Sequence, residues 1–218
     1  MKGVVLSLPV KSRQKNVNTK FLFTGAKRNL FLIFNALFFT AGIIWGAVVE
    51  LKADEAFLLN MDFLFTTNLD SRLEESFLST FMAHFASNFI FFCAALFCGL
   101  SPFGVGLIPL VSAFKGFGTG LSAAFLMSTF GLKGLGFYIV VVLPGTFVFS
   151  LVLLYMGNES MRISLKIAKA FFAQGEEILP LSKFVRRYLF RCTWFLLMSA
   201  AGALVDMLLW SFGSKLFF

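Results

Sequence analysis

Two charged side chains lie inside apolar stretches of the sequence and are its most distinctive candidates for chemistry. Lys115 is the one charged residue within residues 101–130, and Asp206 is the one acid inside any predicted membrane span. A lysine at the centre of a membrane helix costs roughly 2.5 kcal/mol or more, so it needs a partner, a cavity or a route to water. Such residues often mark ion pathways or proton relays, which makes Lys115 and Asp206 the first candidates for a functional site.

The depths of Lys115 and Asp206 in their helices decide whether the two can pair. At a rise of 1.5 Å per residue, Asp206 lies roughly 21 Å from the inner end of its helix. Lys115 lies roughly 18 Å from that side if its helix begins at Phe103, but about 12 Å if it begins at Leu107. Pairing is easy in the first case and strained in the second. The alternative is that each side chain extends towards its nearer interface.

His84 and Asn88 are four residues apart and therefore share one face of a helix. His84 is the only histidine in the chain, and near the end of a span it is predicted to be an interfacial hydrogen-bonding group rather than a base or a metal ligand. Asn88 is predicted to bond to another helix. The sequence contains no Ser/His/Asp, metal-ligand or phosphate-binding constellation, so it predicts no catalytic, cofactor or metal site and no enzyme.

The three cysteines, Cys93, Cys98 and Cys192, lie in or beside apolar runs. Their spacing matches neither a zinc pair nor a redox pair. They are predicted to be small buried apolar residues.

Small residues recur at every fourth position around Lys115, and they include Gly116 and Gly120. A phosphate-binding loop would need a preceding strand and a water-facing helix start, which this segment lacks. Close helix packing through a stripe of small residues is the favoured interpretation. The same glycines, and Pro144 in the next span, also predict two broken helices, and paired breaks of this kind occur at transport sites.

The composition indicates an integral membrane protein, because 58% of the residues are hydrophobic and 32 of the 218 are Phe. We predict a single all-α membrane domain over residues 1–218, a polytopic transmembrane helical bundle with about five spans and Gly/Pro-broken central helices. The predicted spans are residues 29–49, 77–100, 103–130, 135–156 and 192–212.

The charges outside these spans predict how the chain is oriented. Residues 1–28 hold seven Lys/Arg and no acid, residues 50–76 hold seven acids against two basic residues, and residues 157–191 hold seven basic residues against three acids. By the positive-inside rule, the first and third regions are a cytoplasmic tail and a cytoplasmic segment, the second is an external loop, and the chain is N-in/C-out. Residues 160–172 predict an amphipathic helix on the cytoplasmic leaflet. The N-terminus lacks the features of a cleaved signal peptide and is expected to be retained.

The middle of the chain carries several short motifs in a defined order. An entry helix over residues 81–100 contains Asn88, and it is followed by Phe114-Lys115-Gly116 with Gly118 and Gly120, by Ala124-Phe125-Leu126, by Gly-Leu-Lys-Gly at 131–134, by Val142-Leu143-Pro144 and by Tyr155-Met156-Gly157. In order and spacing, these motifs resemble the stage II sporulation protein M family of five-span membrane proteins. One departure is that Gly145-Thr146 follows Pro144, where the family tends to have polar amides.

This resemblance implies a non-enzymatic scaffold in the plasma membrane, enriched at the sporulation septum. Such a scaffold would recruit or stabilise peptidoglycan hydrolases, the stage II sporulation proteins D and P, while the forespore is engulfed. Partner spans are then expected to dock on the stripes Gly42/Gly46 or Gly116/Gly120. The competing hypothesis is a transporter or permease-like subunit that uses Lys115 and Asp206 in broken helices. A lipid-handling protein is a third hypothesis, and membrane lipid is an expected partner in each case, with no role for nucleic acid.

Overall fold

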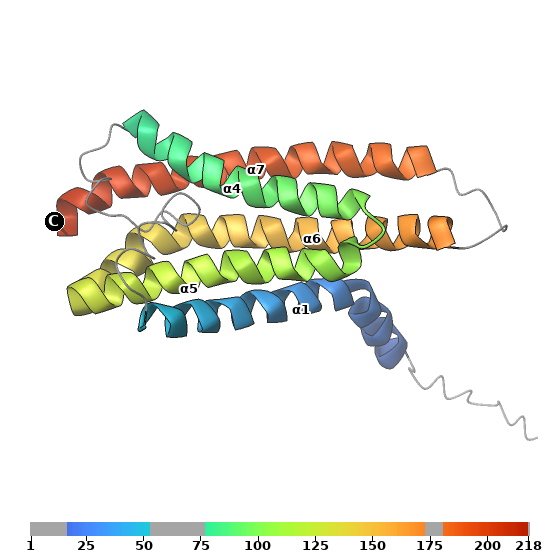
Figure 1. The fold of residues 1–218 in the computed structure, drawn as a ribbon, viewed down its shortest axis with the longest axis horizontal. Coiled ribbons are helices and arrows are strands. Elements are labelled where there is room, and N and C mark those ends of the chain that lie inside the picture. The colour runs from blue at the N-terminus through green and yellow to red at the C-terminus, as the bar shows by residue number, and fades with distance from the viewer. Residues whose placement is uncertain (1–16, 53–76, 173–180, 218) are drawn as a thin grey trace, which may run out of the picture. The chain divides into compact units, whose positions relative to one another are not determined.

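The structure is a computed structural model that describes residues 17–52, 77–172 and 181–217, with side chains for most of them. Every regular element in these ranges is helical (Figure 1). The elements are α1 (Val17–Glu50), α4 (Phe77–Leu100), α5 (Gly104–Phe137), the π-helix η1 (Tyr138–Val142), α6 (Leu143–Phe172) and α7 (Leu181–Phe217). The predicted all-helical class is confirmed, and α4 has the predicted bounds. The acidic loop at residues 50–76 lies largely outside the described residues, as does the tail before residue 17.

The chain divides into two units, Met1–Leu30 and Phe31–Phe218. In the first unit the described residues, from Val17 onward, are the start of α1. The second unit holds the rest of α1 and the other helices. Within the described residues, four helical stretches are long and apolar enough to cross a membrane: Asn29–Glu50, Phe81–Leu100, Gly104–Phe172 and Ser182–Phe212.

The longest of these stretches, Gly104–Phe172, is a hairpin and not one straight helix. Gly131 has φ +60° and ψ −137°, a backbone conformation that only glycine adopts readily. The chain reverses there, and α6 runs back alongside α5 (Figure 1). A Cβ atom at Gly134 would overlap the carbonyl oxygen of Leu126, so a second glycine lets the two limbs approach closely. The turn predicted at residues 131–134 is confirmed.

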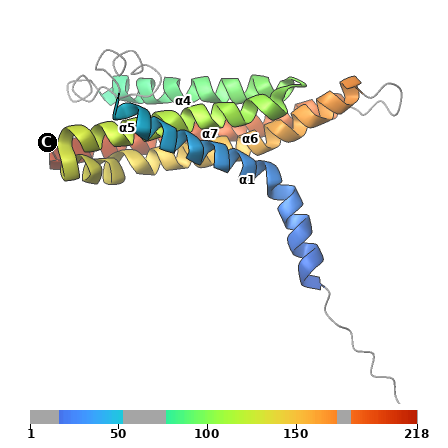
Figure 2. The same cartoon turned by 60° about the horizontal axis from the view of Figure 1, so that its bottom comes forward.

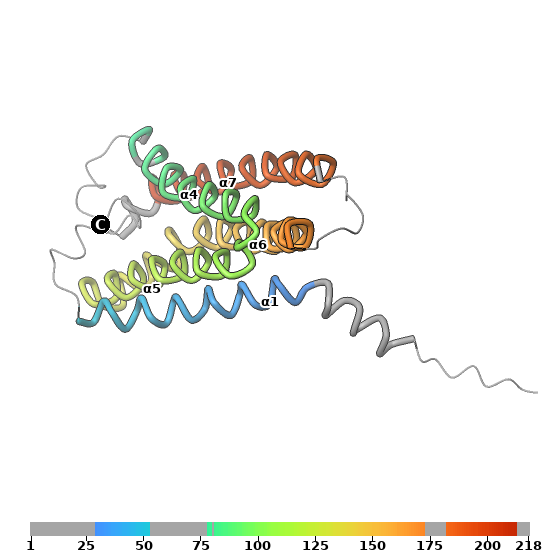
Figure 3. Tube along the Cα trace, turned by 45° about the vertical axis from the view of Figure 1, so that its right-hand side comes forward, coloured from blue at the N-terminus to red at the C-terminus, as the bar shows by residue number. Residues whose placement is uncertain are grey.

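Glycines also join α1 to α5, which lie side by side (Figure 1, Figure 3). A Cβ atom at Gly42 would overlap the carbonyl oxygen of Ala113, and one at Gly120 would overlap that of Ile43. Gly46 and Gly116 are equally close to carbonyls of the opposite helix. Close packing through small residues is therefore confirmed. Both stripes are buried against each other, however, so the expectation that they are exposed docking faces is wrong.

The prediction that glycines break the third span is also wrong, because α5 remains helical from Gly104 through Gly120. Glycine permits a helix break but does not impose one, and here the close contact with α1 holds the helical backbone in place. The break predicted at Pro144 is absent too, because the chain stays helical through the proline and shows only a local irregularity before it. The irregularity is η1, one wide turn just before the proline, and it accommodates the missing N–H and the bulk of the proline ring. The Thr146 hydroxyl donates to the carbonyls of Val142 and Leu143, at 3.0 Å each.

The prediction of a separate surface helix over residues 160–172 is also wrong. These residues continue α6 without a break, and Ser160, Met161 and Ser164 are buried in the bundle. The Ser164 hydroxyl donates to the carbonyl of Ser101 at 2.7 Å and accepts the N–H of Val105 at 3.1 Å. The buried Ser164 therefore bonds this part of α6 to the turn between α4 and α5.

Candidate intramembrane polar site

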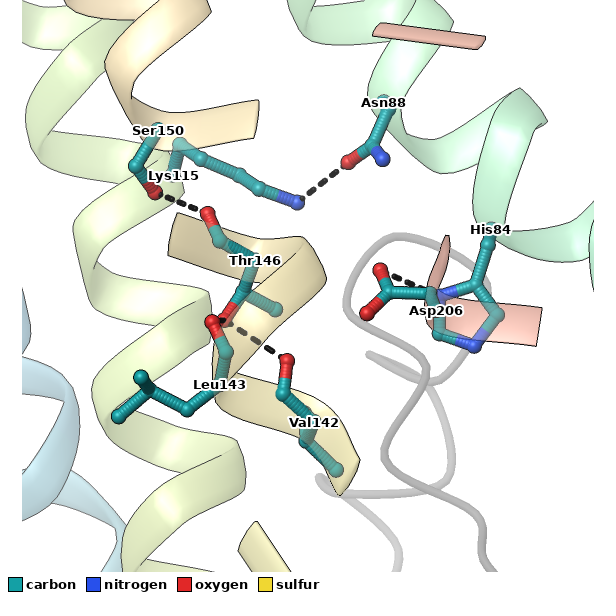
Figure 4. Close-up of polar contacts among 8 residues, drawn as sticks. All are labelled: His84, Asn88, Lys115, Val142, Leu143, Thr146, Ser150 and Asp206. Carbon is teal, nitrogen blue, oxygen red and sulfur yellow. Dashed lines mark hydrogen bonds and ion pairs between the residues drawn. The ribbon is translucent and has the colours of Figure 1, made fainter. Parts of the chain in front are cut away.

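Polar side chains from three helices meet inside the bundle. His84 and Asn88 come from α4, Lys115 from α5 and Asp206 from α7, and each is at most 9% exposed (Figure 4). The uncharged remainder of each helix is rich in Phe, Leu and Ala. Because uncompensated polar groups are costly in such surroundings, the contacts among these four side chains decide what the site can do.

Lys115 is held by α4 and by two aromatic rings. Its Nζ donates to Oδ1 of Asn88 at 3.0 Å and lies 5.0 Å from the ring centroids of both Phe91 and Phe149. A desolvated ammonium over an aromatic face gains about 2 kcal/mol or more, so two rings and an amide together compensate much of the cost of burial. Lys115 thus has the partner that its position requires.

Asp206 lies between α4 and α6. Its Oδ2 is 3.8 Å from Nδ1 of His84. A Cβ atom at position 145 would overlap the Asp206 carboxylate, so the absence of a side chain at Gly145 makes room for it. The carboxylate thus enters from α7 into the space that a side chain at position 145 of α6 would occupy.

The structure brings Lys115 and Asp206 into one interior site, but their closest partners are on α4. Lys115 bonds to Asn88 and Asp206 lies against His84, while the carboxylate interacts with Lys115 electrostatically. The alternative in which both side chains extend to opposite interfaces is wrong, because Lys115 is 7% and Asp206 is 4% exposed. The shared face of His84 and Asn88 links the two charges.

The other predicted site residues have different surroundings. Gly116 and Gly120 face α1, where they allow the close contact of α1 and α5. Pro144 is the second residue of α6, one residue before Gly145. Their contribution to the site is to set the positions of α5 and α6.

Two polar contacts were not predicted from the sequence. Asn35 of α1 is fully buried and donates from Nδ2 to Sδ of Met161 at 3.3 Å. The hydroxyls of Ser160 and Tyr188 lie 2.7 Å apart in the interior, between α6 and α7. An amide in the middle of the uncharged span at residues 29–49 was a usable signal for Asn35. The sequence carried no signal for the contact between Ser160 and Tyr188, because both residues lie in stretches that resemble an interfacial segment.

The described residues contain no group of three or more His, Cys, Asp or Glu side chains placed to hold a metal ion. What the site can do is hold its helices in register. Each buried charge contacts a different helix from its own. Contacts of this kind fix the rotation and register of neighbouring helices, since a shift would leave a charge uncompensated.

A family model described as Stage II sporulation protein M matches residues 35–209, which is most of the chain. The chain belongs to the stage II sporulation protein M family. The match includes the residues of the intramembrane site and the helices that carry them. Neither the comparison with curated proteins nor the comparison with solved structures gave a match. Family membership and the four apolar helical stretches together make this a sporulation-related membrane protein.

Proposed function

We propose that this member of the stage II sporulation protein M family is a non-enzymatic scaffold of the plasma membrane. It recruits or stabilises peptidoglycan hydrolases of the stage II sporulation D and P type at the septum during engulfment. The observation that carries the proposal is the family match over residues 35–209. The bonding of Lys115 to Asn88 supports it, since a charge satisfied within the protein suits a structural role.

The scaffold in this proposal crosses the membrane five times. The hairpin at Gly131 divides the stretch Gly104–Phe172 into two limbs, so that α1, α4, the two limbs and α7 supply five crossings. Contacts between α1 and α5 advance together along the chain, from Gly42 with Ala113 to Gly46 with Phe117, so these helices run parallel. Parallel crossings by the first and third spans agree with an N-in/C-out path, and the positive-inside rule applied to the basic regions supports a cytoplasmic N-terminus.

The glycine stripes are internal and cannot receive a partner, so the proposed docking place is a groove on the surface of the bundle. It lies between α1, α4 and α5, has a volume of about 700 Å³ and is lined almost entirely by apolar atoms. Trp45 and Phe114 stand at its sides, and Ala94 and Ala113 contribute small residues. Small residues let a helix backbone come close within a bilayer, so the proposed occupant is a single membrane-spanning helix of a hydrolase partner.

Co-purification tests the scaffold and the groove together. A tagged full-length chain is isolated from membranes of sporulating cells and its partners are identified. Wild type should retain both hydrolases, and Ala94→Trp, which fills the groove, should lose them. Leu197→Trp, at a 62% exposed position on α7 outside the groove, is the matched control and should retain them. Absence of hydrolases from wild type would reject the scaffold, whereas their retention by Ala94→Trp would reject only the groove.

The second candidate is a transporter-type subunit, and the observation in its favour is the pair of buried charges from α5 and α7. Intramembrane ionisable residues commonly serve ion or substrate pathways. Reconstituted vesicles would then show solute flux that Lys115→Met abolishes. Co-purification of an ATPase in place of hydrolases would also favour this candidate.

A further inference from the structure

The helices α6 and α7 continue beyond the turn that ends α4 and begins α5 (Figure 1), and the end of α6 is also visible beyond that turn in Figure 2. Ser164 bonds to Ser101 of that turn, and α6 then continues for eight residues to Phe172, or about 12 Å. On α7, Tyr188 lies at the level of Leu96, and the seven preceding residues extend about 10 Å. We call residues 165–172 and 181–187 the basic extension.

The basic extension is an ordered pair of helices with one sign of charge among its described residues. Contacts between the two helices hold it together, with Nζ of Lys166 lying 3.9 Å from the centroid of the Phe184 ring. Just inside it, Arg191 pairs with Glu159 at 2.6 Å. Five basic side chains are exposed on the extension: Lys166, Lys169, Lys183, Arg186 and Arg187.

The position of these basic side chains next to the exposed apolar surface of α7 indicates which ligand they bind. On α7 the exposed apolar residues Trp194 and Phe190, at 59% and 64%, flank Arg191, which is paired with Glu159; exposed Arg187 and Arg186 follow towards the helix start. This change from apolar to basic marks the end of the hydrocarbon region along the helix. The headgroup layer beyond is about 5–8 Å thick on each side of a bilayer, so the basic side chains cover its depth.

We propose that the basic extension binds the phosphate headgroups of anionic phospholipids in the leaflet from which it emerges. Lysine and arginine are the usual partners of phosphate groups, and arginine can engage two oxygens of one group at once. The lipid is favoured over a soluble acidic partner because Arg186 and Arg187 directly follow the exposed apolar surface of α7, where the phosphates of a surrounding bilayer are expected. The proposal requires only that the chain spans the membrane and does not depend on hydrolase recruitment.

Lipid binding is measured by native mass spectrometry on the full-length protein in a non-ionic detergent. The protein is titrated with phosphatidylglycerol, with phosphatidylcholine, or with soluble glycerol phosphate. Phosphatidylglycerol should bind more tightly than phosphatidylcholine, and glycerol phosphate should not displace it. Each basic residue removed near the surface should weaken phosphatidylglycerol binding about fivefold.

The variants separate charge from folding. Arg186→Gln with Arg187→Gln should weaken phosphatidylglycerol binding about 25-fold and leave phosphatidylcholine unchanged. Arg186→Lys with Arg187→Lys keeps the charge and should retain most of the binding. Lys133→Gln, at the exposed turn that follows Gly131, is the matched control and should have no effect.

Equal binding of the two lipids by wild type would overturn the proposal. It would also fail if the glutamine variant, with its helical content unchanged, kept its preference for phosphatidylglycerol. Loss of a co-purifying acidic protein with no change in lipid binding would assign the surface to a protein partner and reject the lipid.

Discussion

The carboxylate of Asp206 lies directly over the backbone of Gly145, in the space that any side chain at position 145 would occupy. The two residues stand on α7 and α6 and are 61 positions apart in the sequence. The close approach depends on the absence of a Cβ atom at one residue and a buried charge at the other. The same carboxylate lies 3.8 Å from Nδ1 of His84 on α4.

Gly145→Ala should destabilise the protein. The added methyl group overlaps the carboxylate of Asp206, and overpacking of this kind costs about 1–3 kcal/mol. Thermal unfolding in detergent measures the loss. Gly106→Ala is the control, because a Cβ atom there meets nothing within 4 Å, and it should unfold near the wild-type temperature. Equal melting of both alanine variants would contradict the close contact.

Lys115 and Asn88 should show an energetic coupling in a double-mutant cycle. Lys115→Met removes a buried charge that interacts with both Asn88 and Asp206, and Asn88→Leu leaves the ammonium without its amide. For residues in direct contact, the coupling energy is about 0.5–3 kcal/mol. Reversible unfolding of the two single variants and the double variant gives this value. Strictly additive effects would show that the hydrogen bond contributes no stability.

Gly46→Val should separate α1 from α5 and lower the unfolding temperature. The added Cβ falls on the carbonyl oxygen of Phe117, a backbone atom that cannot move without shifting α5. Because this face is internal, hydrolase recovery should decline only in proportion to the loss of folded protein. If Gly46→Val kept the wild-type unfolding temperature but lost the hydrolases, the docking site would have to lie on the glycine stripes.

The orientation is tested with protease tags on intact cells stripped of their wall. For the proposed N-in/C-out path of five spans, external protease should remove a tag after Phe218 and leave a tag before Met1 intact. A tag inserted at Leu132, which is 85% exposed in the turn between α5 and α6, should also be cut. Protection of the Phe218 tag together with loss of the Met1 tag would reverse the orientation.

Much of the fold was predictable from local patterns. The apolar runs predicted helices, and α4 begins and ends where the sequence indicated, because its polar flanks lie immediately outside the run. Gly131 was predicted as a turn because glycine tolerates the torsion angles that a reversal requires. The fate of the glycines at 116 and 120 was less predictable, since the same residues permit a break or a close contact.

The sequence by itself determined that this protein is helical and apolar, with a few isolated polar residues inside its apolar helices. Helix periodicity and hydropathy are properties of neighbouring residues, so a local pattern records them. Only the tertiary structure decided which of those polar residues meet. Asn88 rather than Asp206 accepts the hydrogen bond from Lys115, and the glycines of α1 and α5 face each other. These pairings depend on the rotation and register of each helix in the bundle, which packing between distant segments sets and no local pattern records.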